Sequence, residues 1–212
     1  MPGDQRYRQL VCAAQRIVER EGLAALTVSA LTKEADVSRP VVYEHFRNSE
    51  GIAIALLEDY FETIVERVDS RTRGASTLDE YLSRAIDAEF EYHRDKCVMV
   101  KNLTNGHANS KGLNSAYLQL RQRTIDTFVE LLSQQGASAQ VARVGGHGLA
   151  ELIPGVVYEF AADADAEMAK ATLKKMIMGA IHAVVPQTTA RPETPAKVLE
   201  ATRAIRKARE QS

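Results

Sequence analysis

The sequence predicts an all-α protein. Apolar residues recur at helical spacing along nearly the whole chain, and no run of alternating β-branched residues stands between hairpin turns. The chain has 212 residues, 45% hydrophobic and 26% charged, which is enough for one core and a small attached module. Its longest apolar stretches fall well short of the roughly 18 residues that a membrane helix needs. We therefore expect helices throughout and no membrane-spanning segment.

The first helix is expected over residues 4–21. Five apolar residues at positions i, i+3, i+4, i+7 and i+8 form one buried face: Leu10, Ala13, Ala14, Ile17 and Val18. Gly22 follows, where a left-handed residue ends many helices. This pattern is typical of a helix that packs with one side against a small core.

Two short helices are expected next. Thr27 is a good N-cap for a helix over about 28–35, and Ser38 is a good N-cap for a helix over 39–44. Pro40 lies in the first turn of the later helix, where its missing N–H breaks no hydrogen bond. Two such helices joined by a tight turn form a helix-turn-helix, whose second helix enters the major groove of DNA.

The residues of this segment match a known signature in order and spacing. They are Leu10, Ala13, Ala14, Ile17, Gly22, Thr27, Val28, Leu31, Ala35, Val37, Ser38, Tyr43, His45, Phe46 and Glu50. With them, residues 7–61 resemble the N-terminal signature of the TetR family of bacterial transcriptional regulators. The resemblance implies a DNA-binding module, a variable helical domain that binds a small-molecule effector, and a homodimer.

The resemblance also assigns contacts to the DNA backbone. Tyr43 matches the family tyrosine that touches the backbone, and His45 matches a frequent second phosphate contact. Thr27 and Ser38 present a hydroxyl and free N–H groups at helix starts, which suit a phosphate oxygen. As N-caps, both residues also stabilise their helices whether or not DNA binds.

Residues at the start of the second short helix are expected to recognise the DNA bases. Arg39 is the candidate base reader, because a guanidinium bonds O6 and N7 of guanine together. Pro40 and Val41 are candidates for apolar contact with a thymine methyl, although they replace a common Gly-Thr of the family. Ser49 stands where the family usually has a lysine, which removes a phosphate contact, and Arg47 is the candidate replacement.

Bulk charge gives no support to DNA binding. Residues 1–50 carry seven basic and seven acidic side chains, residues 51–185 carry 14 and 18, and residues 186–212 carry six and three. Because a basic stripe is the usual mark of nucleic-acid binding, the DNA-binding prediction rests on the motif alone.

Three parts are therefore expected. Residues 1–49 form the helix-turn-helix domain, residues 50–185 the helical effector-binding and dimerisation domain, and residues 186–212 a linker with a basic C-terminal tail helix. The middle part is expected to begin with a helix over 50–69, whose apolar stripe is wide enough for two partners. Further helices are expected over 78–93, 96–107, 113–135, 139–162 and 166–185.

The effector is expected to be a mostly apolar small molecule. Aromatic and aliphatic residues with few charges populate the middle helices, as in most ligand pockets. The candidate ligand-binding residues are Leu57, Phe61, Ile64, Phe90, Met99, His107, Tyr117, Arg121, His147 and Tyr158. The first three lie on the wide stripe of the 50–69 helix, which makes that helix the expected lever between effector and DNA.

The last long helix is expected to form the dimer. Its apolar face consists of Leu173, Ile177, Ala180, Ile181 and Val184. We expect this face to pack against the same face of a second subunit related by two-fold symmetry. Glycines 145, 146 and 148 each cost a helix about 1 kcal/mol relative to alanine. We interpret them as a place of close helix approach in the same interface, with a helix break or room for a ligand as alternatives.

The cysteines and the N-terminus suggest a reducing compartment. Cys12 and Cys97 form at most one bridge, which a chain of this length does not need, so both are expected as buried thiols. The first residues lack the apolar segment of a secretory signal. We expect a cytoplasmic protein.

Other functions have weaker support. Residues 146–151 form a partial G-x-G-x-x-G without the closing glycine or a preceding strand, so no nucleotide site is expected. Glu89, His93 and Cys97 have the spacing of metal ligands on one helix face, but residues 95–96 look like a helix end. No catalytic residues, enzyme activity, metal or cofactor are expected. A helical protein-interaction module without DNA binding remains the alternative function.

Overall fold

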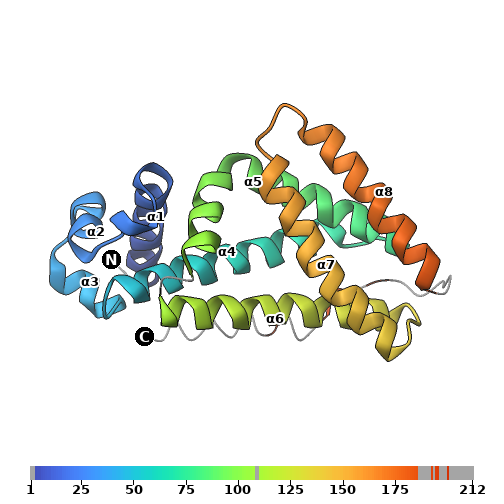
Figure 1. Ribbon diagram of the computed structural model, residues 1–212. Helices are drawn as coiled ribbons and strands as arrows, with labels where there is room; N and C mark the ends of the chain where they lie inside the picture. Colours follow the sequence, from blue (N-terminus) through green and yellow to red (C-terminus); the bar gives the residue numbers. More distant parts are fainter. Residues whose placement is uncertain (1–2, 108–109, 186–191, 193, 196–199, 201–212) are drawn as a thin grey trace. The chain divides into compact units, whose positions relative to one another are not determined.

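The computed structural model describes residues 3–107, 110–185, 192, 194–195 and 200 (Figure 1). In this part of the chain the regular elements are helices and there is no strand, which confirms the all-α prediction. Contacts divide the chain into two compact units. The first combines the residues up to Glu62 with Val98–Leu120, and the second combines Thr63–Cys97 with the residues from Arg121 through the last long helix.

The N-terminal helices follow the expected order. Helix α1 spans Gly3–Glu21, α2 spans Val28–Ala35 and α3 spans Arg39–His45. A short 3₁₀ helix, η1 at Leu23–Ala25, was not expected. The predicted inner face of α1 is at most 1% exposed and consists of Leu10, Ala13, Ala14, Ile17 and Val18. Burial of that face explains why these short helices stay folded, since isolated short helices are marginal in water.

The helix ends have the predicted residues in place. The Oγ1 atom of Thr27 accepts a hydrogen bond from the backbone N–H of Ala30 at 3.0 Å, as expected of an N-cap. Ser38 is also an N-cap, but its side chain makes no capping hydrogen bond. Between α2 and α3 the chain turns at Asp36, whose φ of 51° is the left-handed conformation that polar residues tolerate in tight turns.

The next three helices are long. Helix α4 spans Ser49–Thr72, α5 spans Leu78–Gly106 and α6 spans Lys111–Gln134. Each contributes residues to both units, so the division by contacts falls inside α4 rather than at its start. The sequence predicts a domain boundary between residues 49 and 50, at the end of the helix-turn-helix segment. The division between the two compact units lies elsewhere, after Glu62.

The break expected at residues 95–96 is wrong, because α5 passes through it without interruption. Asp95 and Lys96 are charged, but neither removes a backbone N–H or requires a special backbone conformation. The buried face also resumes after them, since Met99, Val100 and Leu103 are at most 1% exposed. Buried apolar residues before and after Asp95 and Lys96 favour one continuous helix more strongly than these two charged residues favour a helix end.

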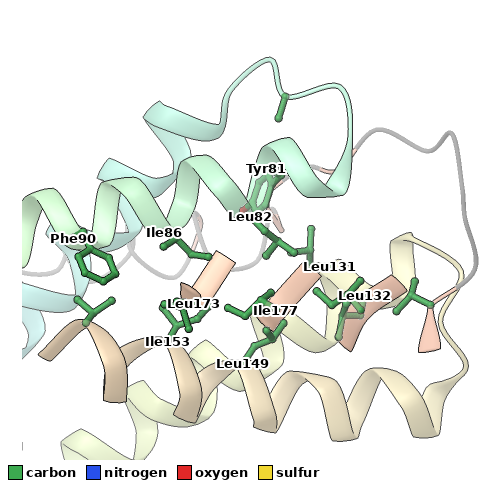
Figure 2. Close-up of a cluster of buried hydrophobic side chains, with 14 of the residues drawn as sticks. Tyr81, Leu82, Ile86, Phe90, Leu131, Leu132, Leu149, Ile153, Leu173 and Ile177 are labelled. Atoms are coloured by element: carbon green, nitrogen blue, oxygen red, sulfur yellow. The ribbon is translucent and has the colours of Figure 1, made fainter. Parts of the chain in front are cut away.

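The last two helices complete the core of the second unit. Helix α7 spans Ala139–Phe160 and α8 spans Ala166–Val184. Figure 2 shows side chains from α5, α6, α7 and α8 that meet in one apolar cluster. Its larger members are Tyr81, Leu82, Ile86, Phe90, Leu131, Leu132, Leu149, Ile153, Val157, Leu173, Ile177 and Ile181.

This cluster corrects the expected dimer face. Leu173, Ile177 and Ile181 are at most 5% exposed inside the chain's own core, so they are not available to a second copy. These three residues of the apolar stripe pack within the same chain, whereas the other two residues of the expected face, Ala180 and Val184, are exposed. Met168 and Met176 lie elsewhere on α8 and are 57% and 54% exposed.

The glycines of α7 serve a contact within the chain. A Cβ atom on Gly145 would lie 2.6 Å from Leu132 Cδ1, and one on Gly146 would lie 2.5 Å from Val129 Cγ2. Both neighbours belong to α6, so these glycines allow α6 and α7 to approach closely, rather than marking a break. A Cβ on Gly148, the third of these glycines, would meet nothing within 4 Å.

The sequence also predicts the burial of both cysteines and a C-terminal helix. Cys12 is exposed, because it falls on the outer side of α1, so the expectation of a buried thiol is wrong there. The side chain of Cys97 and the expected terminal helix after Pro195 lie outside the described residues. Within the described part, no helix is both long enough and apolar enough to cross a membrane.

Candidate nucleic-acid interface

Helix α3 presents opposite sides to the core and to solvent. Val42 is fully buried, and Phe46 just after the helix is 5% exposed. Arg39, Pro40 and Tyr43 are exposed, and Tyr43 retains 54% of its accessible surface. An aromatic ring this exposed on a short helix contributes little to folding. The solvent side of α3 is therefore shaped for contact with another molecule.

Arg39 is oriented by the neighbouring helix. Its Nη2 atom donates a hydrogen bond to Oγ of Ser29 on α2 at 2.8 Å. The side chain is exposed, and the remaining N–H groups of the guanidinium are enough for a bidentate contact. This bond between α2 and α3 reduces the conformational freedom that Arg39 would lose on reading a base.

His45 is held by aromatic neighbours. Its ring centroid lies 6.1 Å from that of Tyr7 on α1 and 6.2 Å from that of Phe46. The residue is half-buried, so packing fixes the ring while part of it remains accessible. The other predicted DNA contacts lie nearby in sequence: Thr27, Ser38 and Arg47 are exposed and Val41 is half-buried.

Part of the positive charge of this module is neutralised internally. Glu34 on α2 binds Arg16 and Arg20 of α1, with N–O distances of 2.7 and 3.0 Å. The hydrogen bonds from Arg16 and Arg20 lower the pKa of the Glu34 carboxyl below its usual value. These two arginines connect α1 to α2, which leaves five of the seven basic residues counted above for contacts with DNA.

Glu50 makes a contact that sequence reasoning missed. Its carboxylate, in the first turn of α4, accepts hydrogen bonds from the Ser110 hydroxyl and, at 3.0 Å, from the backbone N–H of Gly112. These donors lie at the start of α6, so Glu50 caps a helix 60 residues further along the chain. Hydrogen bonds from Ser110 and Gly112 lower the pKa of Glu50.

Other contacts join the same parts of the first unit. Asn102 on α5 donates a hydrogen bond to the carbonyl oxygen of Val18 on α1 at 3.1 Å. A Cβ on Gly106 would lie 2.5 Å from a Leu23 methyl carbon, so the end of α5 lies directly against η1. The last turns of α5 and the start of α6 are thus attached to α1, to η1 and to the start of α4.

Glu50→Gln is expected to weaken the first unit, most clearly in its response to acid. A carboxyl whose pKa is lowered by folding contributes stability above its unfolded pKa of about 4.3, and this contribution is lost as pH falls through the lowered folded value. The wild-type urea midpoint should thus fall more between pH 7 and pH 3 than that of the variant. Glu44→Gln, on the exposed side of α3, is the matched control. Equal pH responses of all three proteins would contradict this role.

The candidate ligand-binding residues are divided between the units. Those in the first unit are Leu57, Phe61, Met99, His107 and Tyr117, and those in the second are Ile64, Phe90, Arg121, His147 and Tyr158. In the first unit, Leu57 and Met99 are buried, Phe61 is half-buried with its ring 5.1 Å from that of Tyr60, and His107 stacks on Tyr117 with 4.0 Å between ring centroids. His107 Nδ1 also lies 2.9 Å from Oδ1 of Asn114.

The five in the second unit have different surroundings. Phe90 is part of the apolar core, and Ile64 is 9% exposed. Arg121 forms an ion pair with Glu151 of α7, and His147 is on the exposed side of α7. Tyr158 lies beside the buried His93, with 5.1 Å between ring centroids. The structure does not bring all ten residues together within one unit.

Comparison with known proteins identifies the N-terminal module. Residues 10–56 match the family model described as bacterial regulatory proteins, tetR family. The helix-turn-helix of this chain therefore matches the TetR family model. The match includes α2 and α3 and ends within α4, so it covers the exposed helix described above. The curated relatives that the chain matches are named as HTH-type transcriptional regulators.

Curated transcriptional regulators align with the chain beyond the module to different degrees. The transcriptional activator FasR of Mycolicibacterium smegmatis is 28% identical over 92 residues, which cover 43% of this chain and 42% of FasR. The transcriptional regulator BetI of Vibrio parahaemolyticus is 27% identical over 168 residues, which cover 71% of this chain and 78% of BetI. The chain thus spans less than half of FasR and about three quarters of BetI.

Solved structures of transcriptional regulators share the fold of the chain. SCO4454, a TetR-family regulator of Streptomyces coelicolor, has a TM-score of 0.69 at 22% identity and covers 84% of this chain and 90% of its own. FadR of Bacillus subtilis in complex with stearoyl-CoA has a TM-score of 0.68 at 19% identity. The match covers 83% of this chain and 100% of the FadR chain. A regulator from Saccharomonospora viridis in complex with choline has a TM-score of 0.66 at 16% identity. The match covers 86% of this chain and 99% of that chain.

Proposed function

We propose that this TetR-type chain is a cytoplasmic homodimeric transcriptional repressor that a small-molecule effector releases from a palindromic operator. The observation that carries the proposal is the exposed side of α3 in a module of the TetR family. That side presents Arg39 and an exposed Tyr43, and Val42 anchors the helix from its opposite side. A helix that is anchored on one side and exposed on the other suits insertion into a major groove.

The DNA contacts proposed above follow from these positions. Arg39 reads a guanine, and Pro40 with Val41 contacts a thymine methyl. Tyr43, His45, Thr27, Ser38 and Arg47 contact the sugar-phosphate backbone, with Arg47 replacing the charge that Ser49 lacks. Ser29 supports this arrangement, because its hydroxyl holds Arg39 in place.

A dimer is proposed through the exposed sides of α7 and α8. Val144 on α7 is 68% exposed, and α8 exposes Met168, Met176 and Val184, with Gly179 and Ala183 nearby. Large apolar side chains exposed on neighbouring helices favour burial against a second copy. Gly148 adds open space on α7 for a close approach. Such an obligate interface is expected to bury about 2,000 Å² or more.

The effector is proposed to be a mostly apolar small molecule. Proteins of similar fold hold choline in one case and stearoyl-CoA in another, so this fold accommodates small ligands of very different chemistry. The aromatic and aliphatic composition of the middle helices of this chain favours a ligand with much apolar surface.

Selection of genomic fragments by the purified protein, followed by footprinting, tests this function. We expect protection of a palindrome by one dimer, with half-sites about 34–36 Å apart. Log affinity plotted against log salt concentration is expected to have a slope of about −3 to −6, because few basic residues remain for phosphates. No sequence-selective binding at low salt would overturn the proposal and leave a protein-interaction module instead.

A further inference from the structure

A polar and aromatic cluster lies within the second unit, on α5 and α7. Glu89, Tyr92 and His93 belong to α5, and Tyr158 belongs to α7. The His93 side chain is fully buried, and its ring centroid lies 5.3 Å from that of Tyr92 and 5.1 Å from that of Tyr158. Three aromatic rings therefore meet beside an acidic side chain.

Burial keeps His93 from supplying a positive charge to Glu89. The Nδ1 atom of His93 donates a hydrogen bond to the backbone oxygen of Glu89 at 2.7 Å and lies 3.4 Å from its carboxylate Oε2. Burial lowers the pKa of His93 to about 4, so its ring is neutral at pH 7. Burial also raises the pKa of the Glu89 carboxyl to about 7.

Within the residues that the structure describes, several other acidic side chains of α5 form ion pairs with lysine or arginine, and Glu89 does not. Asp87 binds Lys174 at 2.7 Å, Glu91 forms an ion pair with Arg71, and Glu80 forms one with Arg84. In the described part of the chain, no lysine or arginine nitrogen is found at ion-pair distance from Glu89. Its side chain is still 19% exposed, so a small molecule can reach it.

We propose that Glu89, with the half-buried ring of Tyr158, binds an apolar organic cation, a substituted ammonium, as the effector. The ammonium supplies the positive charge that Glu89 lacks, and ring faces stabilise a cation from the side. The adjacent Tyr92 ring already has a cation on its face, because the guanidinium carbon of Arg67 lies 5.3 Å from its centroid. The assignment names the ligand class for the regulator proposed above and rests on that function.

Binding of a cation has a measurable consequence for protons. A positive charge beside Glu89 favours the ionised carboxyl, so binding near pH 7 releases a proton in a fraction of the molecules. The groups that face the cluster are Tyr92 and His93 on α5, Tyr158 on α7 and, over Tyr92, Arg67 on α4. His93 stays neutral on either side of binding, so the proton comes from Glu89.

Isothermal titration calorimetry in two buffers of different ionisation enthalpy tests this site on the full chain at pH 7. The probes are benzyltrimethylammonium and a neutral analogue, 2,2-dimethyl-3-phenylpropan-1-ol. We expect the wild type to bind the cation at least tenfold more tightly than the alcohol, with proton release. Glu89→Gln should weaken cation binding at least tenfold and abolish that release. Glu91→Gln, two residues along the same helix, should change neither.

The outcomes separate this inference from the proposed function. Equal affinity for the two probes, absence of proton release in the wild type, or unchanged cation binding by Glu89→Gln would each overturn the cation site. The proton release needs only the wild type, so it decides the matter even if the variant does not fold. Operator binding by the wild type without probe is measured in parallel, and its absence would overturn the regulatory function alone.

Discussion

Ile177→Asp is expected to abolish stable folding of the second unit. Ile177 is 1% exposed and lies within the apolar cluster of Figure 2, where a carboxylate would have no water. Burial of an unpaired charge together with loss of an apolar side chain costs several kcal/mol, against a typical total stability of about 5–15 kcal/mol. Urea denaturation followed by circular dichroism should show a large loss of stability, or the protein should be insoluble.

The adjacent residue provides the matched control. Met176 directly precedes Ile177 in α8 but is 54% exposed, so Met176→Asp introduces the same charge with little cost to folding. If the exposed sides of α7 and α8 form the dimer, this variant should sediment as a folded monomer. A folded dimer of Met176→Asp would place the dimer interface elsewhere, and a stable Ile177→Asp would contradict the described core.

Arg39→Ala is expected to weaken binding to the selected operator by about 1–3 kcal/mol, roughly 5- to 150-fold, and to relax the preference at one base of each half-site. The physical reason is loss of a bidentate contact from a guanidinium that Ser29 already orients. Fluorescence anisotropy with the operator and with each single-base variant of a half-site measures both effects.

Arg47→Ala is the comparison for a backbone contact. It should weaken binding about equally on all sequences and make the salt slope shallower by about 1, because it removes a phosphate contact. If Arg39→Ala behaves in the same way, Arg39 contacts phosphate and does not read a base. Arg16 lies on α1 and its side chain binds Glu34, so Arg16→Ala is expected to leave base preference unchanged.

Local signals predicted the N-terminal helices well. Thr27 starts α2 with the expected hydrogen bond, and the periodic face of α1 is buried as its spacing indicated. These features act within one turn of a helix, so the neighbouring residues specify them. The same local reasoning failed at residues 95–96, because burial of Met99 and Leu103 by distant parts of the chain decides whether α5 continues.

The candidate sites differ in the same way. The residues proposed for DNA contact follow one another along a short segment, so a motif identifies them even where no structure is known. Glu50 and Glu89 are different, because one caps a helix 60 residues away and the other is defined by rings from two helices. Spacing along the chain contains no signal for either arrangement.

The sequence alone determined that the chain is helical, that α2 and α3 carry a DNA-binding motif, and that α8 has an apolar stripe. Only the tertiary structure decided what that stripe meets: Leu173 and Ile177 pack inside the chain. It also decided that Gly145 and Gly146 of α7 face α6. The physical reason is that hydrophobic attraction is non-directional. A periodic pattern specifies which side of a helix avoids water, but the surface that covers it depends on the whole fold.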